Sequence, residues 1–287
     1  MTKATLGLLL TALALSACAG KPTATRHGAW VSPPSQAACL AQIDDGQEPP
    51  FIRNCFGNFE RASAVAIAYA EWRAWGQVVY DADPHAELAV DPDTKAERQP
   101  GLWQRVGLYW WIGMNQSNAS AGWTGKTDAT GAQFSPEDDG GYAWSAAFIS
   151  FVMRMAGAGA GFPYAESHSV YINAAVEQTL NQTNQYAIQA EPPNVYAPGI
   201  GDLICTGRGR AEKLTYAQLP ADRFAAHCGI VVARAPGQIS IIGGNVEDAV
   251  ALTHVPVTDQ GLLATPDGTV VDPRYPWLVV IHVAYNQ

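Results

Sequence analysis

Hydrophobic and polar positions follow a helical period in the first part of this chain. In four stretches the apolar side chains recur every three or four residues, and alanine and aromatic residues are frequent. These stretches are residues 56–80, 102–114, 144–156 and 167–180. The stretch 144–156 has almost no polar face, which indicates a buried helix. Ser167 is placed to cap the start of the fourth helix.

Later in the chain the pattern changes to short apolar runs with glycine and proline between them, which is typical of strands and turns. The predicted strands are residues 201–205, 228–234, 238–243, 249–257 and 277–284. Segments 81–101 and 115–141 are polar and rich in Pro or Gly, so we expect loops there. Helices followed by strands predict an α+β fold with an antiparallel sheet covered on one side.

The first residues predict export. Residues 1–17 hold a single positive charge and a short apolar run, which is typical of a signal peptide and too short to span a bilayer. The string Leu15-Ser16-Ala17-Cys18 resembles the bacterial lipobox, in which the cysteine is acylated and becomes the mature N-terminus. Ala19 then implies, by resemblance to Gram-negative lipoproteins, the outer membrane facing the periplasm. Residues 18–35 are expected to form a tether.

Composition limits the choice of partners. With 48% hydrophobic and 15% charged residues the remainder of the chain is globular. A net charge of -9 without any basic stripe argues against nucleic-acid binding, because basic surface supplies most of that affinity. The expected partners are a membrane, through lipid on Cys18, and peptidoglycan. The sequence does not define an oligomeric state.

Five cysteines fit an exported protein. With Cys18 lipidated, sequence proximity and strand pairing predict two disulfides, Cys39–Cys55 and Cys205–Cys228. A catalytic Cys228 is the competing interpretation, but its apolar strand would raise the thiol pKa. No Cys or His pair has zinc spacing, so no metal is expected. The glycines of residues 157–161 follow a helix in the pattern G-x-G-x-G, so no nucleotide cofactor is expected either.

Four strings occur in the order typical of papain-like cell-wall hydrolases. W-S-A-A-F-I-S-F-V-M-R-M-A-G at residues 144–157 resembles the nucleophile helix of the CHAP and NlpC-type amidase/peptidase families, with serine in place of cysteine. Residues 198–204, 226–232 and 242–246 resemble their Gly-Asp strand, histidine strand and strand with the third polar residue. The resemblance covers about residues 135–285 and implies a papain-like domain at 135–287 behind an N-terminal helical region at 36–134. The serine helix, the run 167–171 and I-G-G-N-V together resemble the uncharacterised bacterial domain family numbered 2272.

The resemblance implies roles for three side chains. Ser145 would be the nucleophile in the first turn of its helix, where unpaired N–H groups and the helix dipole stabilise an anion. His227 would be the base, and Asn245 would orient its imidazole. His168 is an alternative base.

Serine at the nucleophile position leaves two functions open. A neighbouring imidazole can ionise a thiol before substrate arrives, whereas a serine hydroxyl must lose its proton during attack. One interpretation is an envelope lipoprotein that binds peptidoglycan or peptide without established catalysis. The alternative is a cell-wall amidase or endopeptidase that uses Ser145, His227 and Asn245. Aromatic residues between 103 and 123 would form the core or line a glycan-binding face.

Overall fold

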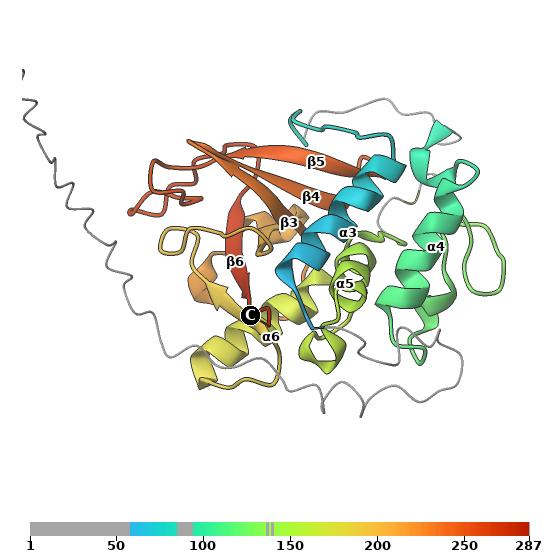
Figure 1. Cartoon of the computed structure of the whole chain (residues 1–287), viewed down its shortest axis with the longest axis horizontal. Helices are drawn as coiled ribbons and strands as arrows, with labels where there is room; N and C mark the ends of the chain where they lie inside the picture. The colour runs from blue at the N-terminus through green and yellow to red at the C-terminus, as the bar shows by residue number, and fades with distance from the viewer. Residues whose placement is uncertain (1–57, 85–93, 136–137, 139–140, 287) are drawn as a thin grey trace, which may run out of the picture. The chain divides into compact units, whose positions relative to one another are not determined.

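The chain folds as predicted into the α+β class, with helices on one side of an antiparallel sheet (Figure 1). The computed structural model describes residues 58–84, 94–135, 138 and 141–286. The predictions for the signal peptide, the tether, Cys18 and the Cys39–Cys55 disulfide lie outside these residues.

Four α-helices lie within the described part of the chain, close to the predicted positions. They are α3 (Arg61–Ala74), α4 (Leu102–Gly113), α5 (Ser145–Met155) and α6 (His168–Asn181). Short 3₁₀ turns occur in the connecting segments at η2 (Ala96–Arg98), η3 (Ala119–Gly122), η4 (Gly159–Gly161), η5 (Gly209–Lys213) and η6 (Tyr216–Gln218). Every residue of α5 from Ser145 to Arg154 is buried, which explains its missing polar face.

The first helix ends earlier than predicted. We expected it to reach residue 80, but Gly76 (φ 87°) and Gln77 (φ 60°) adopt left-handed conformations that a right-handed helix cannot continue. The chain then runs along the edge of the sheet, where the Tyr80 N–H donates to the Leu252 carbonyl at 2.9 Å. Of the apolar residues after Gly76, Val78 packs against the core, whereas Val79 is 51% exposed.

The sheet has six strands in the order β1-β6-β2-β3-β4-β5, and every neighbouring pair is antiparallel. The strands are β1 (Ile188–Glu191), β2 (Leu203–Gly207), β3 (Ala226–Ala235), β4 (Gln238–Val246), β5 (Ala249–Pro256) and β6 (Trp277–Val283). The sequence did not predict β1, because this edge strand has four residues and only two of them are buried apolar side chains.

Helices α3 and α4 pack with α5, and α5 in turn packs on β3 and β4. Aromatic side chains fill the centre of this arrangement. The Trp75 and Trp144 rings stack with centroids 5.3 Å apart, and Trp75 Nε1 donates to Tyr109 Oη at 2.8 Å. This core holds the start of α5 against the sheet.

Two features fix the centre of the sheet. Asp202, only 1% exposed, accepts hydrogen bonds from the backbone N–H groups of Gly199 and Val283, which ties the turn before β2 to β6. The structure also contains the predicted Cys205–Cys228 disulfide, between directly opposed residues of β2 and β3. His227 is therefore next to a covalent cross-link.

Candidate active site

Ser145 is the first residue of α5, and the residue is 6% exposed. The preceding residue, Trp144, supplies no side-chain cap. The first N–H groups of an α-helix have no partner within the helix, and the helix dipole places partial positive charge there. The Ser145 hydroxyl thus lies at the end of a helix that favours negative charge.

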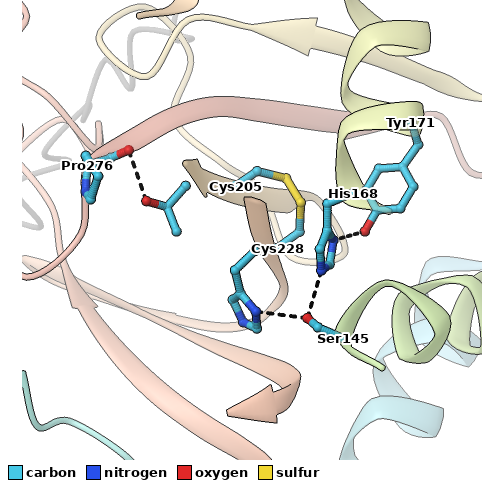
Figure 2. Close-up of a disulfide and its surroundings, with 8 residues drawn as sticks. Ser145, His168, Tyr171, Cys205, Cys228 and Pro276 are labelled. Carbon is cyan, nitrogen blue, oxygen red and sulfur yellow. Dashed lines mark hydrogen bonds between the residues drawn. A yellow bond between two sulfur atoms is a disulfide. The ribbon is translucent and has the colours of Figure 1, made fainter. Parts of the chain in front are cut away.

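Two imidazoles contact this hydroxyl. Nδ1 of His227, on β3, lies 2.9 Å from Ser145 Oγ, and Nε2 of His168, at the start of α6, lies 2.8 Å from it. Figure 2 shows Ser145 facing His168, with Tyr171 on the far side of that ring. Both histidines weighed in the sequence therefore meet the predicted nucleophile.

The hydrogen-bond pattern indicates which atoms of Tyr171, His168 and Ser145 carry the protons. Tyr171 is fully buried, and among the described residues its hydroxyl hydrogen-bonds only with His168 Nδ1. An unsatisfied buried hydroxyl costs about 1–3 kcal/mol, so the tyrosine donates to Nδ1. His168 then carries its proton on Nε2 and donates to Ser145 Oγ. The Ser145 proton is left to donate to Nδ1 of His227.

Burial keeps both imidazoles neutral. It lowers the pKa of His227 to about 3, with a further contribution from the positive charge of Arg208. Burial also holds the pKa of His168 well below its usual value, and His227 and Arg208 act in the same direction. The pKa of the Tyr171 hydroxyl is raised well above its usual value by burial. At neutral pH His227 therefore has the free lone pair that a general base needs.

Asn245 lines the same cleft but makes no hydrogen bond with the described residues, so the expected bond to the His227 ring is not formed. Its backbone is left-handed (φ 57°), and the pairing of β4 with β5 shifts between Gly243 and Val246. Such an irregularity turns a side chain away from its regular direction. Hydrogen bonds therefore connect Ser145 with His227 and His168. Asn245, the third residue predicted for the site, lines the cleft without joining this group.

Two glycines of β4 make this geometry possible. A Cβ on Gly243 would lie 2.8 Å from His227 Nε2, and one on Gly244 would lie 2.5 Å from Phe148 Cβ. Real Cβ contacts do not come this close. The pair in I-G-G-N-V therefore lets the strand approach both the imidazole and α5.

Glu97 is a residue of the site region that the sequence did not single out. Its carboxylate accepts a hydrogen bond at 2.5 Å from Nε1 of Trp144, the residue directly before Ser145. Glu97 is 2% exposed, and burial together with the charge of Asp248 raises its pKa to about 7. It lies in a segment predicted as loop, and nothing in the local pattern distinguishes it from a solvent-exposed acid.

Ser145, His168 and His227 open into a cleft of about 830 Å³. Aromatic side chains of Trp110, Trp123 and Tyr142 form part of its wall. A second cavity of about 210 Å³ shares Arg208, His227 and Asn245 with the cleft. The cleft that Ser145 lines is thus large enough for a molecule of several residues or sugar units.

Within the described ranges, no group of three or more His, Cys, Asp or Glu side chains is arranged to hold a metal ion. No helix in these ranges is both long and apolar enough to cross a membrane.

Comparison with known proteins agrees with one of the two resemblances. Neither the curated proteins nor the solved structures contain a match to this chain. The family DUF2272, described as an uncharacterized protein conserved in bacteria, matches residues 97–283, which include α4 to β6 and the whole cluster around Ser145. The chain therefore belongs to the DUF2272 family of bacterial proteins.

Proposed function

We propose that this chain is a serine acyl hydrolase of the bacterial envelope, an amidase or endopeptidase that acts on peptidoglycan or peptide. The observation that carries the proposal is the 2.9 Å contact between Ser145 Oγ and His227 Nδ1 at the start of α5. Serine nucleophiles need a base within hydrogen-bond reach and nearby N–H groups for the developing oxyanion. The His227 contact and the position of Ser145 at the start of α5 support both requirements.

In this mechanism Ser145 Oγ attacks the carbonyl carbon of the substrate while its proton passes to His227 Nδ1. The oxyanion forms beside the N–H groups of the first turn of α5, which stabilise it without rearrangement. His227 then protonates the leaving amine, the carbon–nitrogen bond breaks, and an acyl-enzyme remains. Water, deprotonated by His227, releases the acyl group and restores the hydroxyl.

The papain-like relationship is part of the same proposal. A nucleophile at the start of a buried helix, a histidine on a neighbouring antiparallel strand and a polar residue on the next strand follow the order of the CHAP and NlpC-type families. The proposed site differs from theirs in two respects. Serine replaces cysteine, and His168 with Tyr171 supports the hydroxyl.

We place the enzyme on the outer membrane, facing the periplasm, through lipid on Cys18. The lipobox-like string supports this location, and a disulfide at Cys205–Cys228 fits an oxidising compartment. Peptidoglycan is the polymer within reach of such an anchor. Trp123 is a partly exposed aromatic side chain of the cleft wall, and its ring suits stacking on a sugar.

A second candidate function is binding without catalysis. It is favoured by Asn245, which does not hold the His227 ring, and by a Ser145 hydroxyl engaged with two imidazoles. In that case the cleft would capture the same ligands and release them unchanged.

Digestion of purified peptidoglycan separates the two candidates. The whole chain would be compared with its Ser145→Ala and Ser145→Cys variants, and the products identified by mass spectrometry. Fragments released by the wild type and absent with Ser145→Ala would support the hydrolase and identify the bond. Activity confined to Ser145→Cys would favour a binder that retains the cleft, and inactivity of all three would contradict the proposal.

A further inference from the structure

Arg208 lies where the cleft and the smaller cavity meet. It follows β2, and its backbone N–H donates to the Ala225 carbonyl at 3.0 Å. Thr206, two residues earlier, is paired with His227 across β2 and β3. Of the described residues, three line both cavities: Arg208, His227 and Asn245. The loop after β2 thus positions the Arg208 guanidinium at the junction of the two cavities, where His227 also lies.

This guanidinium has no acidic partner among the described residues. Other arginines that line these cavities are already engaged. Arg223 pairs with Glu166 at 3.1 Å, and Arg274 pairs with Asp272 at 2.8 Å. The nearby Glu212 accepts a hydrogen bond from the Gly209 N–H at 3.0 Å instead of pairing with Arg208. In a chain of net charge -9, an arginine that lines the cleft of Ser145 without an acidic partner among the described residues is available for an external anion.

The charge of Arg208 also opposes protonation of the base. It contributes to the lowered pKa values of both His227 and His168. During attack His227 must become an imidazolium, which a neighbouring cation disfavours. An anion bound to Arg208 would offset the positive charge of the guanidinium and make proton transfer from Ser145 to His227 easier.

We infer that Arg208 binds a carboxylate of the substrate, so that the chain acts on acidic peptides whose carboxylate lies next to the bond attacked by Ser145. The binding of a carboxylate is inferred from the geometry of the two cavities. That the bound molecule is a substrate rests on the proposed hydrolase function. Guanidinium is suited to the task because its planar N–H groups match both oxygens of a carboxylate. Binding of the carboxylate would therefore select the substrate and at the same time favour protonation of His227.

Binding to the Ser145→Ala variant of the whole chain tests the inference without requiring turnover. Three peptide probes are compared by calorimetry: acetyl-Ala-Glu-Ala-amide, acetyl-Ala-Gln-Ala-amide and acetyl-Ala-Gln-Ala with a free C-terminal carboxylate. One of the two carboxylate peptides is expected to bind about tenfold more tightly than the neutral one, the effect typical of a charge-assisted hydrogen bond. The pair distinguishes a side-chain carboxylate from a terminal one.

The same measurements are repeated after Arg208→Gln, Arg208→Lys and Lys213→Gln. Arg208→Gln should abolish the preference, and Arg208→Lys should keep part of it. Lys213→Gln is the matched control, because it removes one positive charge from the same loop but lines neither cavity, and it should leave the preference intact. Titration of the His227 imidazole by NMR should show that the preferred peptide raises the His227 pKa only when Arg208 is present.

Equal binding of charged and neutral peptides, binding of none of them, or a preference that survives Arg208→Gln would overturn the inference. Hydrolysis of the same peptides by the wild type is measured separately. A carboxylate preference without hydrolysis of these peptides or of peptidoglycan would reject the proposed nucleophile and leave the role of Arg208 standing.

Discussion

At the residue scale, the two imidazoles around Ser145 have different surroundings and therefore different roles. His168 is 4% exposed and accepts a hydrogen bond from the buried Tyr171 hydroxyl at Nδ1, so its single ring proton, on Nε2, points at the serine. His227 borders both cavities and presents a lone pair to the same oxygen. In our account His168 orients the hydroxyl, and His227 removes its proton.

Substitution of the two histidines tests this division. His227→Ala should lower kcat by at least about 100-fold, since it removes the general base. His168→Gln retains an N–H that can donate to Ser145 and should lower kcat by less than about tenfold. Steady-state rates on peptidoglycan fragments provide the measurement, with thermal unfolding as the control for folding. Larger losses from His168→Gln than from His227→Ala would reverse the assignment.

Ser145 and His227 could be predicted because each begins a recognisable element. Their contact spans 82 positions of sequence, and only the family resemblance suggested it. Asn245 was expected to bond to the ring, but a left-handed backbone at that position depends on the pairing of β4 with β5. Arg208 and Glu97 gave no local signal, because an isolated charged residue in a loop is normally solvated.

At the scale of elements, the site depends on how closely β4 approaches α5. Gly243 lies against the His227 ring, and Gly244 lies against Phe148 and Trp144. The two positions differ in what an added methyl group would meet, one an active-site ring and the other the packed core. Substitution at each should therefore affect different properties.

Gly244→Ala should lower the free energy of unfolding by about 1–3 kcal/mol, because its Cβ would overlap the core of α5. Gly243→Ala should reduce activity more than stability, because its Cβ would displace the His227 ring. Denaturant unfolding and rate measurements on both variants check this. Gly107→Ala in α4 is the control, since its Cβ meets no atom closer than 3.4 Å. Equal effects of all three substitutions would contradict the account.

Glu97 links the η2 turn to Trp144, the residue before Ser145, and its burial should make stability depend on pH. Its pKa is about 7 in the folded chain against an ordinary value of 4.5, so between these values the folded state holds a proton that the unfolded state has lost. The stabilisation is complete below pH 4.5 and is lost as pH rises through 7.

Relative to Glu97→Gln, the wild type should therefore lose up to about 3 kcal/mol of unfolding free energy between pH 4.5 and 7. Urea unfolding of both proteins at several pH values in this range provides the measurement. Glutamine can still accept from Trp144 Nε1, so it is a conservative comparison. Parallel stability curves for the two proteins would show that Glu97 does not titrate in this way.

The long periodic elements could be predicted from sequence, because the core side chains of a helix or strand recur at a fixed spacing. The four helices and five of the strands follow from that pattern. The end of α3 and the strand β1 could not be predicted. The first depends on the conformations of Gly76 and Gln77, and the second on pairing with β6, which is distant in the sequence.

At the scale of the whole molecule, the Cys205–Cys228 disulfide joins the two strands that carry the loop of Arg208 and the proposed base. It closes a loop of 23 positions in the sequence. A cross-link of this length lowers the entropy of the unfolded chain and stabilises the fold by about 3 kcal/mol.

Replacing both cysteines by alanine should remove about that amount of unfolding free energy. The comparison uses substitution and not a reductant, because a reductant would also act on other cysteines of the chain. Urea unfolding of wild type and the double variant provides the measurement. Identical midpoints would show that the disulfide contributes nothing to stability.

The central claim is that Ser145 is a nucleophile activated by His227, and covalent labelling tests it most directly because no substrate need be known. The whole chain would be treated with a fluorophosphonate, which reacts with activated serine hydroxyls, and the adduct located by peptide mass spectrometry. We predict one adduct on the peptide that contains Ser145, and its loss in His227→Ala. An unlabelled Ser145, or equal labelling of Ser145 in the His227→Ala variant, would contradict the account.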